Sequence, residues 1–312
     1  MKRRIHGLWR LTRFTEYVSF VLITTLLGAA AGHGSLGWPL VVVLAANLLA
    51  VGFAFMINDV EDAPDDAINP AKVNRNPVSS GDLSPRSARV YSFAAALLAA
   101  GLYAWVGWWP FMVGVACLTL AFLYSSRRVR LKAIPVADLA SHGLMLAGLQ
   151  FLTAYLTFGG GPLREWGVPL TFVMATSLYG QLFNELRDLE GDRQAGVRHT
   201  ANLLGPKLAH VLMMTWFCIG IASAIATFFV LRLVPVWVLA TMAGLALVLA
   251  LRPLLRVRRG HSAIEIHRPF HKPFEVAAAI AFSAWFAGPW ALSTLSSWLV
   301  PAAARWASLI AR

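Results

Sequence analysis

Residues 56–66 read MINDVEDAPDD, so five acidic side chains stand directly at the end of an apolar run that covers residues 38–57. A transmembrane helix needs about 20 mostly apolar residues, and this run is that long. The acids therefore stand where a membrane-spanning helix would leave the hydrocarbon. Ionisable groups at such a boundary are costly when they face the inside of a helix bundle, and for that reason they tend to be functional.

The composition of the whole chain agrees with a membrane protein. Of its 312 residues, 58% are hydrophobic and only 13% are charged, whereas a soluble domain carries about 25% charged residues. This balance excludes an ordinary soluble enzyme and a disordered chain. The two cysteines, Cys117 and Cys218, both lie in apolar runs and are expected to be buried thiols.

The apolar runs predict an all-α polytopic membrane protein with nine transmembrane helices in a bundle around a central cavity. We expect a single domain over residues 1–312, made of two related halves, helices 1–4 and 5–8, and a ninth helix. The predicted spans are residues 17–32, 38–57, 88–106, 108–125, 135–158, 167–184, 208–231, 234–251 and 274–299. Residues 29–31 resemble a signal-peptidase site, but a retained first helix agrees better with the charge pattern.

Basic residues are distributed unevenly between the predicted loops. Of the 27 Lys and Arg residues, 23 fall in the N-terminal segment and in the loops after even-numbered spans. This bias predicts a cytoplasmic N-terminus and an external C-terminus. It also accounts for most of the net charge of +12, so we expect neither a nucleic-acid partner nor an obligate protein partner. The predicted location is a bacterial or archaeal cell membrane, with the active site facing the cytoplasm.

A second acidic cluster, FNELRDLEGD at residues 183–192, follows the sixth predicted span as the first cluster follows the second. Both clusters carry Asn, then an acid one residue later, and Asp four and eight residues later. The matched positions are Asn58 with Asn184, Asp59 with Glu185, Asp62 with Asp188, and Asp66 with Asp192. This register indicates an internal repeat.

A spacing of four places side chains on one face of a helix. Pro64 is expected to disturb the first cluster, near residues 60–63. Hard oxygen ligands in such an arrangement suit Mg²⁺, which commonly bridges protein carboxylates to a substrate phosphate. The simpler alternative is that these acids are solvated residues at helix ends. We predict instead that the clusters face each other across one cytoplasm-side cavity, lined by Asp62 and Asp188.

The two clusters and two further loops resemble the UbiA superfamily of intramembrane prenyltransferases. Asn58, Asp59, Asp62 and Asp66 match that family's Asn-Asp-x-x-Asp-x-x-x-Asp motif, and residues 188–192 match its second, Asp-x-x-x-Asp motif. The remaining matches are Arg75 before Pro77 and Gly81, which resembles the family's Arg-Pro…Gly loop, and Tyr124-Ser125 with Lys132, which resembles its Tyr-Ser…Lys loop. Asn184-Glu185 and Arg127-Arg128 depart from the family pattern at the polar end of the site.

The resemblance implies transfer of a prenyl group from an allylic prenyl diphosphate to a lipophilic acceptor, most often an aromatic ring, within membrane lipid and with Mg²⁺ as cofactor. The residues expected at the metal are Asp59, Asp62, Asp66, Glu185, Asp188 and Asp192. Among these, we expect catalytic roles for Asp62, Asp66, Asp188 and Asp192. The residues expected at the substrate are Asn58, Arg75, Tyr124, Arg128, Lys132 and Asn184.

Two other functions stay open at this point. A membrane terpene cyclase would use the same diphosphate site without an acceptor pocket. A cation transporter would use the acidic repeat to coordinate its ion, although acids at one membrane face and two copies of the same orientation argue against this.

Two further polar features stand outside the repeat. Asp138 is expected to cap a helix or pair with a neighbouring Arg, with a general base for the acceptor as the alternative. The loop of residues 261–272 contains three His and a Glu. Its irregular spacing and its basic residues favour an interfacial loop over a metal site, and a role in acceptor binding is the third possibility.

Overall fold

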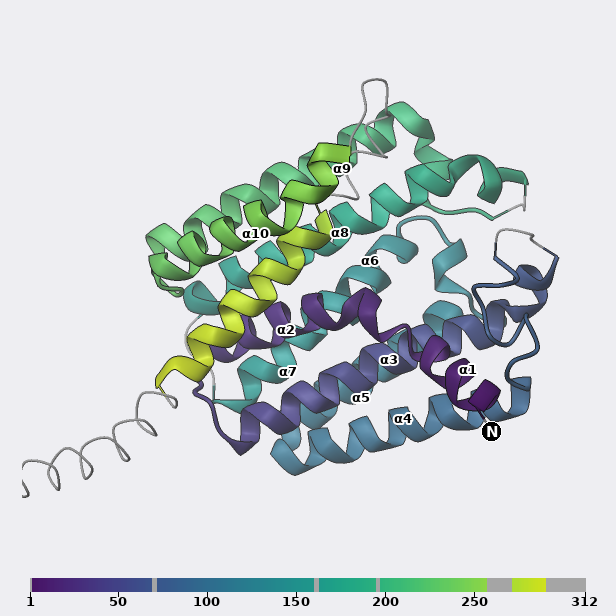
Figure 1. The fold of residues 1–312 in the computed structure, drawn as a ribbon, viewed down its shortest axis with the longest axis horizontal. Helices are drawn as coiled ribbons and strands as arrows, with labels where there is room; N and C mark the ends of the chain where they lie inside the picture. Colours follow the sequence, from purple (N-terminus) through teal and green to yellow (C-terminus); the bar gives the residue numbers. More distant parts are fainter. Residues whose placement is uncertain (1, 69–71, 160–162, 195–196, 257–270, 290–312) are drawn as a thin grey trace, which may run out of the picture. The chain divides into compact units, whose positions relative to one another are not determined.

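The structure is a computed structural model that describes residues 2–68, 72–159, 163–194, 197–256 and 271–289 (Figure 1). Every regular element within these residues is helical. The chain divides into two compact units, the first made of Met1–Gly34 and Trp38–Val236 and the second of Ser35–Gly37 and Trp237–Arg312. Both acidic clusters belong to the first unit.

The helices follow one another along the chain, with longer connections between α3 and α4 and between α5 and α6. They are α1 Lys2–Thr12, α2 Phe14–Ala31, α3 Trp38–Ala67, α4 Pro85–Val106, α5 Trp108–Ser125, α6 Ala137–Gly143, α7 Leu149–Thr157, α8 Leu163–Gln194, α9 Thr200–Ile225 and α10 Val236–Arg256. A π-helical turn, Leu144–Gly148, joins α6 to α7, and a second one, Ala226–Val230, continues α9. A short 3₁₀ turn covers Leu131–Ala133, and a last helical segment covers residues 271–289.

Six helical segments in the described residues are long and apolar enough to cross a membrane. They are Phe14–Ala31, Trp38–Ala67, Pro85–Val106, Trp108–Ser125, Ala137–Thr157 and Thr200–Val230. These confirm the coarse prediction of an all-helical protein with several apolar spans. The predicted spans 88–106 and 108–125 leave one residue between them, and α4 ends and α5 begins on either side of it, Gly107, whose φ is 150°.

Both acid-bearing helices continue beyond the ends of the predicted spans, α3 to Ala67 and α8 to Gln194. The expected disturbance by Pro64 is wrong, because α3 runs through it without interruption. Side chains from other segments bond the carbonyl groups near this end of α3. Asn76 donates to the Asp59 carbonyl at 2.7 Å, Arg127 to that of Glu61 at 2.8 Å, and Ser79 to that of Ala63 at 2.8 Å. The carbonyl that an N–H at position 64 would have bonded is that of Val60, so these bonds do not replace the missing donor but tie the last turns of α3 to neighbouring segments.

One part of the core of the first unit lies where α2, α3 and α7 pack together, and another lies between α6, α8 and α9. Gly28 allows close approach, since a Cβ at this position would lie 2.4 Å from the carbonyl oxygen of Phe151 on α7. Small residues at helix contacts are typical of membrane bundles. At the same level Asn47 is fully buried. It donates to Thr25 at 2.8 Å and accepts from Tyr103 at 2.6 Å, and so joins three helices.

The two cysteines differ in exposure. Cys117 is buried, as expected, and its thiol donates to the Met145 carbonyl at 3.2 Å. Cys218 is exposed on α9, so the expectation that it is buried is wrong. An apolar run in a membrane protein includes side chains that face lipid as well as side chains that face the core, and the run alone does not separate them.

Candidate active site

Lys132 lies directly on the first acidic cluster. Its Nζ is 2.6 Å from both carboxylate oxygens of Asp62 and donates to Oδ1 of Asn58 at 2.8 Å. Burial lowers the pKa of Lys132 below its ordinary value, and the charge of Asp62 offsets part of that effect. Ser125 donates to the same Asn58 oxygen at 3.3 Å. The loop after α5 and the end of α3 thus form one polar group, and its role in substrate binding stays a prediction.

The other acids of α3 also have partners from distant segments. Asp65, which the motif does not include, forms ion pairs with Arg127 at 2.7 Å and with Arg130 at 2.9 Å. Asp66 accepts from Asn76 at 2.9 Å. The side chain of Asn76 is 2% exposed and also accepts from the backbone N–H of Val78 at 2.9 Å. Sequence reasoning missed Asn76, although its place directly before Pro77 in a matched loop was a usable signal.

Arg13 is the partner of the buried acid Asp59, at 3.4 Å. It stands between α1 and α2 with a left-handed φ of 48°, and its guanidinium also binds Glu16 and lies 4.6 Å from the centre of the Phe55 ring. Sequence reasoning counted Arg13 only as a topology signal. The acid of Glu16, at the edge of an apolar run, was the feature that could have identified a buried ion pair.

The second cluster on α8 repeats the burial pattern of the first. Glu185 is buried like Asp59, while Asp188 and Asp192 are half-buried like their counterparts in α3. Arg187 binds both carboxylate oxygens of Asp188, at 2.9 and 2.8 Å. The two acidic clusters therefore share their spacing along the helix and the exposure of their three acids.

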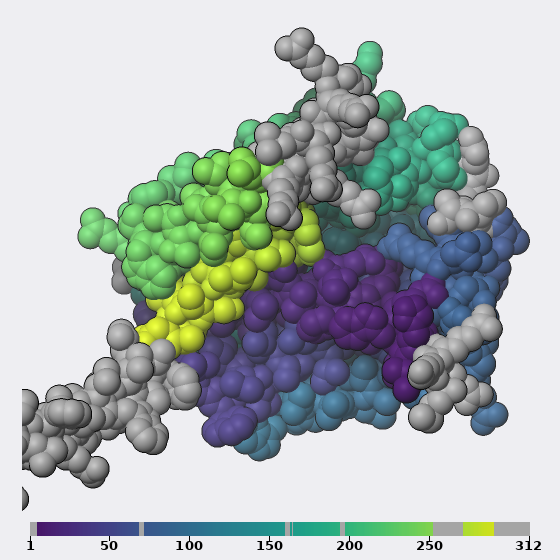
Figure 2. All heavy atoms as spheres, viewed as in Figure 1, coloured from purple at the N-terminus to yellow at the C-terminus, as the bar shows by residue number. Residues whose placement is uncertain are grey.

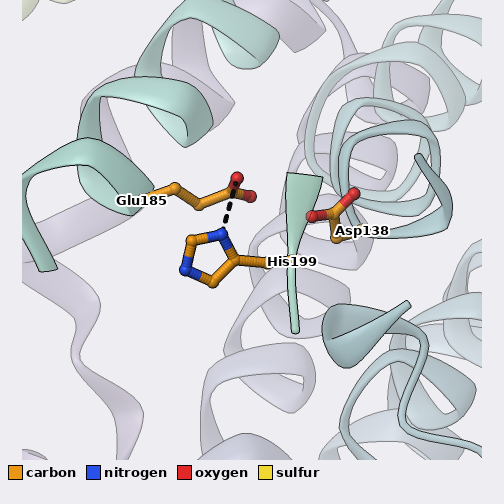
Figure 3. A group of neighbouring side chains, drawn as sticks. All are labelled: Asp138, Glu185 and His199. Atoms are coloured by element: carbon orange, nitrogen blue, oxygen red, sulfur yellow. Dashed lines mark ion pairs between the residues drawn. The ribbon is translucent and has the colours of Figure 1, made fainter. Parts of the chain in front are cut away.

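His199 joins two acids of the second cluster. Its Nδ1 lies 3.3 Å from Glu185 Oε2 and its Nε2 lies 3.2 Å from Asp192 Oδ2; Figure 3 shows the first of these ion pairs. Burial lowers the pKa of His199, but the hydrogen bonds and charges of the two carboxylates outweigh it and raise that pKa to about 9. The raised pKa favours the charged imidazolium, which pairs with both acids, and the N–H of Asn202 also points at Nδ1, at 3.3 Å. Sequence reasoning missed this residue.

Asp138 caps the N-terminus of α9. Its carboxylate accepts from the N–H and the hydroxyl of Thr200, both at 2.5 Å, and from the N–H of Leu139 at 2.7 Å. Glu185 accepts from the next N–H of α9, that of Ala201, at 3.1 Å. This agrees with the capping role expected for Asp138, and carboxylates at a helix N-terminus are favoured by the helix dipole.

Asp138, Glu185 and His199 each offer one potential ligand atom, and these atoms lie within 4.8 Å of one another (Figure 3). A metal here would need His199 as a neutral imidazole. The raised pKa of His199 and the N–H donors of α9 act against that. This group therefore holds the start of α9 against α8, while the oxygens of Asp188 lie outside it.

A polar path leads from one cluster to the other. The amide of Gln181 donates to Glu185 Oε1 at 2.9 Å and to the hydroxyl of Tyr124 at 3.4 Å. Tyr124 directly precedes Ser125, which bonds Asn58. Gln181, one turn before Glu185, is a third residue that sequence reasoning missed.

Charges from the loop after α3 also act on the second cluster. Burial would raise the pKa of Asp188, but its hydrogen bond and ion pair with Arg187, together with the charges of Lys72 and Arg75, lower it below the ordinary value. Arg75 is exposed and lies 3.5 Å from Glu16. The shared cavity lined by Asp62 and Asp188 stays a prediction that these contacts favour.

Two of the expected substrate residues lie apart from these contacts. Arg128 and Asn184 are both exposed, and neither joins the bonded groups described above. Asn184 thus differs from its repeat partner Asn58, which is half-buried and bonded. The loop of residues 261–272 falls outside the described residues up to residue 270, so its role stays a prediction.

Residues 21–268 match the model of the UbiA prenyltransferase family. The chain belongs to the UbiA prenyltransferase family. The chain is 30% identical to a lycopene elongase/hydratase of Haloferax volcanii over 78% of its own length and 72% of that protein. It is 29% identical to the bacteriochlorophyll synthase 33 kDa chain of Cereibacter sphaeroides, over 71% of each.

The fold is that of a solved UbiA homolog from Archaeoglobus fulgidus, bound to GPP and Mg²⁺. The TM-score is 0.66 at 20% identity, and the match covers 90% of this chain and 98% of that one. Family membership confirms the resemblance found in the sequence. The protein is a prenyltransferase, and its apolar helices make it a membrane protein.

Proposed function

We propose that this prenyltransferase is Mg²⁺-dependent and moves a prenyl group from an allylic prenyl diphosphate to a lipophilic, electron-rich acceptor inside the membrane. The observation that carries the proposal is the repeated register of acids on α3 and α8, with the same burial at matched positions. Support also comes from the Archaeoglobus fulgidus homolog, whose structure contains GPP and Mg²⁺.

The chemistry of the donor set fits Mg²⁺. The half-buried acids at matched positions offer only oxygen ligands, which Mg²⁺ prefers. We assign the metal to Asp59, Asp62, Asp66, Glu185, Asp188 and Asp192. Glu185 is the weakest of these assignments, because both its oxygens are engaged by Gln181, His199 and the start of α9. When bound, Mg²⁺ would neutralise the diphosphate and so favour its departure.

The basic residues of the chain bind and orient the diphosphate. Lys132 stands on a rigid 3₁₀ turn at the first cluster, and Arg75 acts on acids of both clusters. Their charges stabilise the diphosphate as the C–O bond breaks and its electron pair leaves with the oxygen. Tyr124, between Asn58 and Gln181, lines the path from one cluster to the other.

The membrane interior protects the allylic cation until the acceptor captures it. Apolar surroundings exclude water, and each isoprene unit gains about 25 cal/mol per Å² of apolar surface that it buries. The acceptor's π electrons then form the new bond to the allylic carbon, and the acceptor loses a proton to the departed diphosphate. The names of the two relatives above refer to different lipophilic molecules, lycopene and bacteriochlorophyll, so similarity leaves the acceptor open between lipophilic classes.

We further propose nine transmembrane helices in a single domain, in the cell membrane of a bacterium or archaeon, with the clusters facing the cytoplasm. The excess of basic residues in the loops next to the clusters supports this orientation.

The decisive experiment incubates purified full-length protein with labelled prenyl diphosphates of several lengths, Mg²⁺ and a panel of lipophilic acceptors. A labelled, prenylated acceptor that needs both substrates supports the proposal. Cyclised hydrocarbon from the donor alone would show a terpene cyclase, and ion flux across vesicles without product would show a transporter. Undiminished turnover in excess EDTA would contradict the metal dependence.

A further inference from the structure

Helix α1 lies at the surface of the first unit and has two different sides. Ile5 and Trp9 are 62% and 56% exposed, while Gly7 and Leu11 are buried. The N-terminal helices can be followed on the surface in Figure 2. An amphipathic helix with an exposed Trp and neighbouring basic residues is typical of a helix that rests in the membrane interface. Its buried side must therefore be held by the protein.

Arg10 bonds the buried side of α1 to the loop between α3 and α4. Its Nη1 lies 2.6 Å from Oδ2 of Asp82, and its Nη2 donates to the backbone carbonyls of Asn74 and Arg75, the latter at 3.0 Å. Its partners are 64, 65 and 72 residues further along the chain. One planar guanidinium thus ties α1 to two places in the loop between α3 and α4.

The loop is held near this contact from within as well. Ser80 donates to the same carboxylate oxygen of Asp82 at 3.1 Å, and the N–H of Leu83 donates to the Pro77 carbonyl at 3.0 Å. Close packing adds to these bonds, since a Cβ on Gly7 would lie 3.1 Å from Leu83 and 3.2 Å from Asp82. The loop is thus fixed near Asp82, and Arg10 extends that restraint to the backbone of residues 74 and 75.

The backbone that Arg10 bonds belongs in part to Arg75, the residue proposed above to bind the diphosphate. Arg75 presents an exposed side chain, 3.5 Å from Glu16, and its charge acts on Asp59 in the first cluster and on Asp188 in the second. The carbonyl bond from Arg10 fixes where that side chain starts. Losing the bond would let Arg75 move without removing any charge from it.

We propose that Arg10 is a positioning residue for donor binding, acting from the interfacial helix α1 through the backbone of Arg75. This rests on the proposed function, in which Arg75 binds the diphosphate of the donor. Arg10 is not expected to bind the donor itself. Both its terminal nitrogens are already bonded, to the carboxylate of Asp82 and to the carbonyls of Asn74 and Arg75.

The first test compares Arg10→Ala, Arg10→Lys and Arg86→Ala in the full-length protein. Arg86 is exposed on the first turn of α4, next to the same loop, and controls for the loss of one positive charge. We expect the donor KM to rise about tenfold in Arg10→Ala, as when one charged hydrogen bond is lost, with kcat little changed. Arg10→Lys should restore only part of the donor affinity, because one ammonium group cannot bond Asp82 and the two carbonyls with the geometry of a guanidinium. An unchanged KM in Arg10→Ala would overturn the proposal.

The second test asks whether Arg10 acts through Arg75. In a protein that already carries Arg75→Ala, adding Arg10→Ala should raise the donor KM by less than twofold. If the two effects multiply instead, Arg10 acts by another route, such as general stability, and the positioning role is refuted.

A third readout does not depend on prenyl transfer. Trypsin cleaves after Lys72 and Arg75, both exposed in this loop, so the rate of cleavage there reports how firmly the loop is held. We expect faster cleavage in Arg10→Ala than in the unsubstituted protein and in Arg86→Ala. Equal rates would overturn the proposal, whereas faster cleavage in a protein that transfers no prenyl group would leave the contact established and refute the proposed function.

Discussion

The ammonium nitrogen of Lys132 lies 2.6 Å from each carboxylate oxygen of Asp62, although 70 residues separate them along the chain. An ammonium group and a divalent cation compete for the same oxygen lone pairs. In the proposed mechanism Asp62 binds Mg²⁺ and Lys132 binds the diphosphate, so donor and metal together must draw this pair apart. The contact therefore links metal binding to donor binding.

Removing that competitor should have opposite effects on the two ligands. In Lys132→Ala the Mg²⁺ concentration for half-maximal activity should fall about threefold, because Asp62 no longer gives up an ion pair. The donor KM should rise about tenfold, because one charged contact to diphosphate is lost. Initial rates over a grid of Mg²⁺ and donor concentrations measure both. A higher Mg²⁺ requirement in Lys132→Ala would show that the lysine does not compete with the metal.

Loss of an acid at either matched position should be far more severe. Asp62→Ala and Asp188→Ala should each lower turnover at least 100-fold while the protein still inserts into membranes, since each removes a ligand of the ion that stabilises the leaving diphosphate. Labelled prenyl transfer by membranes with equal amounts of protein measures the effect. Full activity in Asp62→Ala would defeat the metal mechanism.

Loss of a basic residue should lower activity less than loss of Asp62 or Asp188 does, and the effect should depend on where the basic residue lies. Arg75→Ala should mainly raise the donor KM, by about tenfold, because the metal still neutralises much of the charge. Arg258→Ala, in a loop outside the described residues, is expected from the sequence to be nearly silent. A strong loss of donor binding in Arg258→Ala would place the diphosphate against that loop instead.

His199 should matter for stability as well as for activity. In His199→Ala the buried Glu185 loses the cation that pairs with it, and breaking a buried ion pair costs about 3–5 kcal/mol. The melting temperature of the purified protein in EDTA should fall by several degrees. His210→Ala, at an exposed position of the same helix, serves as the control. Equal melting temperatures in the two variants would show that His199 does not hold the start of α9.

Removal of the metal should stop turnover reversibly. Excess EDTA should abolish prenyl transfer and added Mg²⁺ should restore it, because in the proposed mechanism the oxygen ligands of α3 and α8 hold an exchangeable Mg²⁺. Thermal unfolding with and without Mg²⁺ gives a second readout, since a ligand that binds only the folded state raises its stability.

The sequence by itself determined the helical membrane class, most span positions and the repeated register of acids. These follow from distances along the chain: a run of about 20 apolar residues is a span, and acids four apart share a helix face. For the same reason it placed Asp62 and Asp188 at matched positions, and the family motifs pointed to Lys132, which the structure places against Asp62; their roles at the site stay a prediction. Sequence reasoning failed at Pro64, where α3 continues and its last turns bond side chains of distant segments, Asn76, Arg127 and Ser79, which the local pattern does not show.

Only the tertiary structure decided which cation meets which acid. Arg13 lies 46 residues from Asp59, and the pairing of His199 with Glu185 depends on how α9 begins beside α8. Such contacts depend on the packing of whole helices. A basic residue that signals topology and one that neutralises a buried acid have the same sequence signature, and burial of the acid is what separates them.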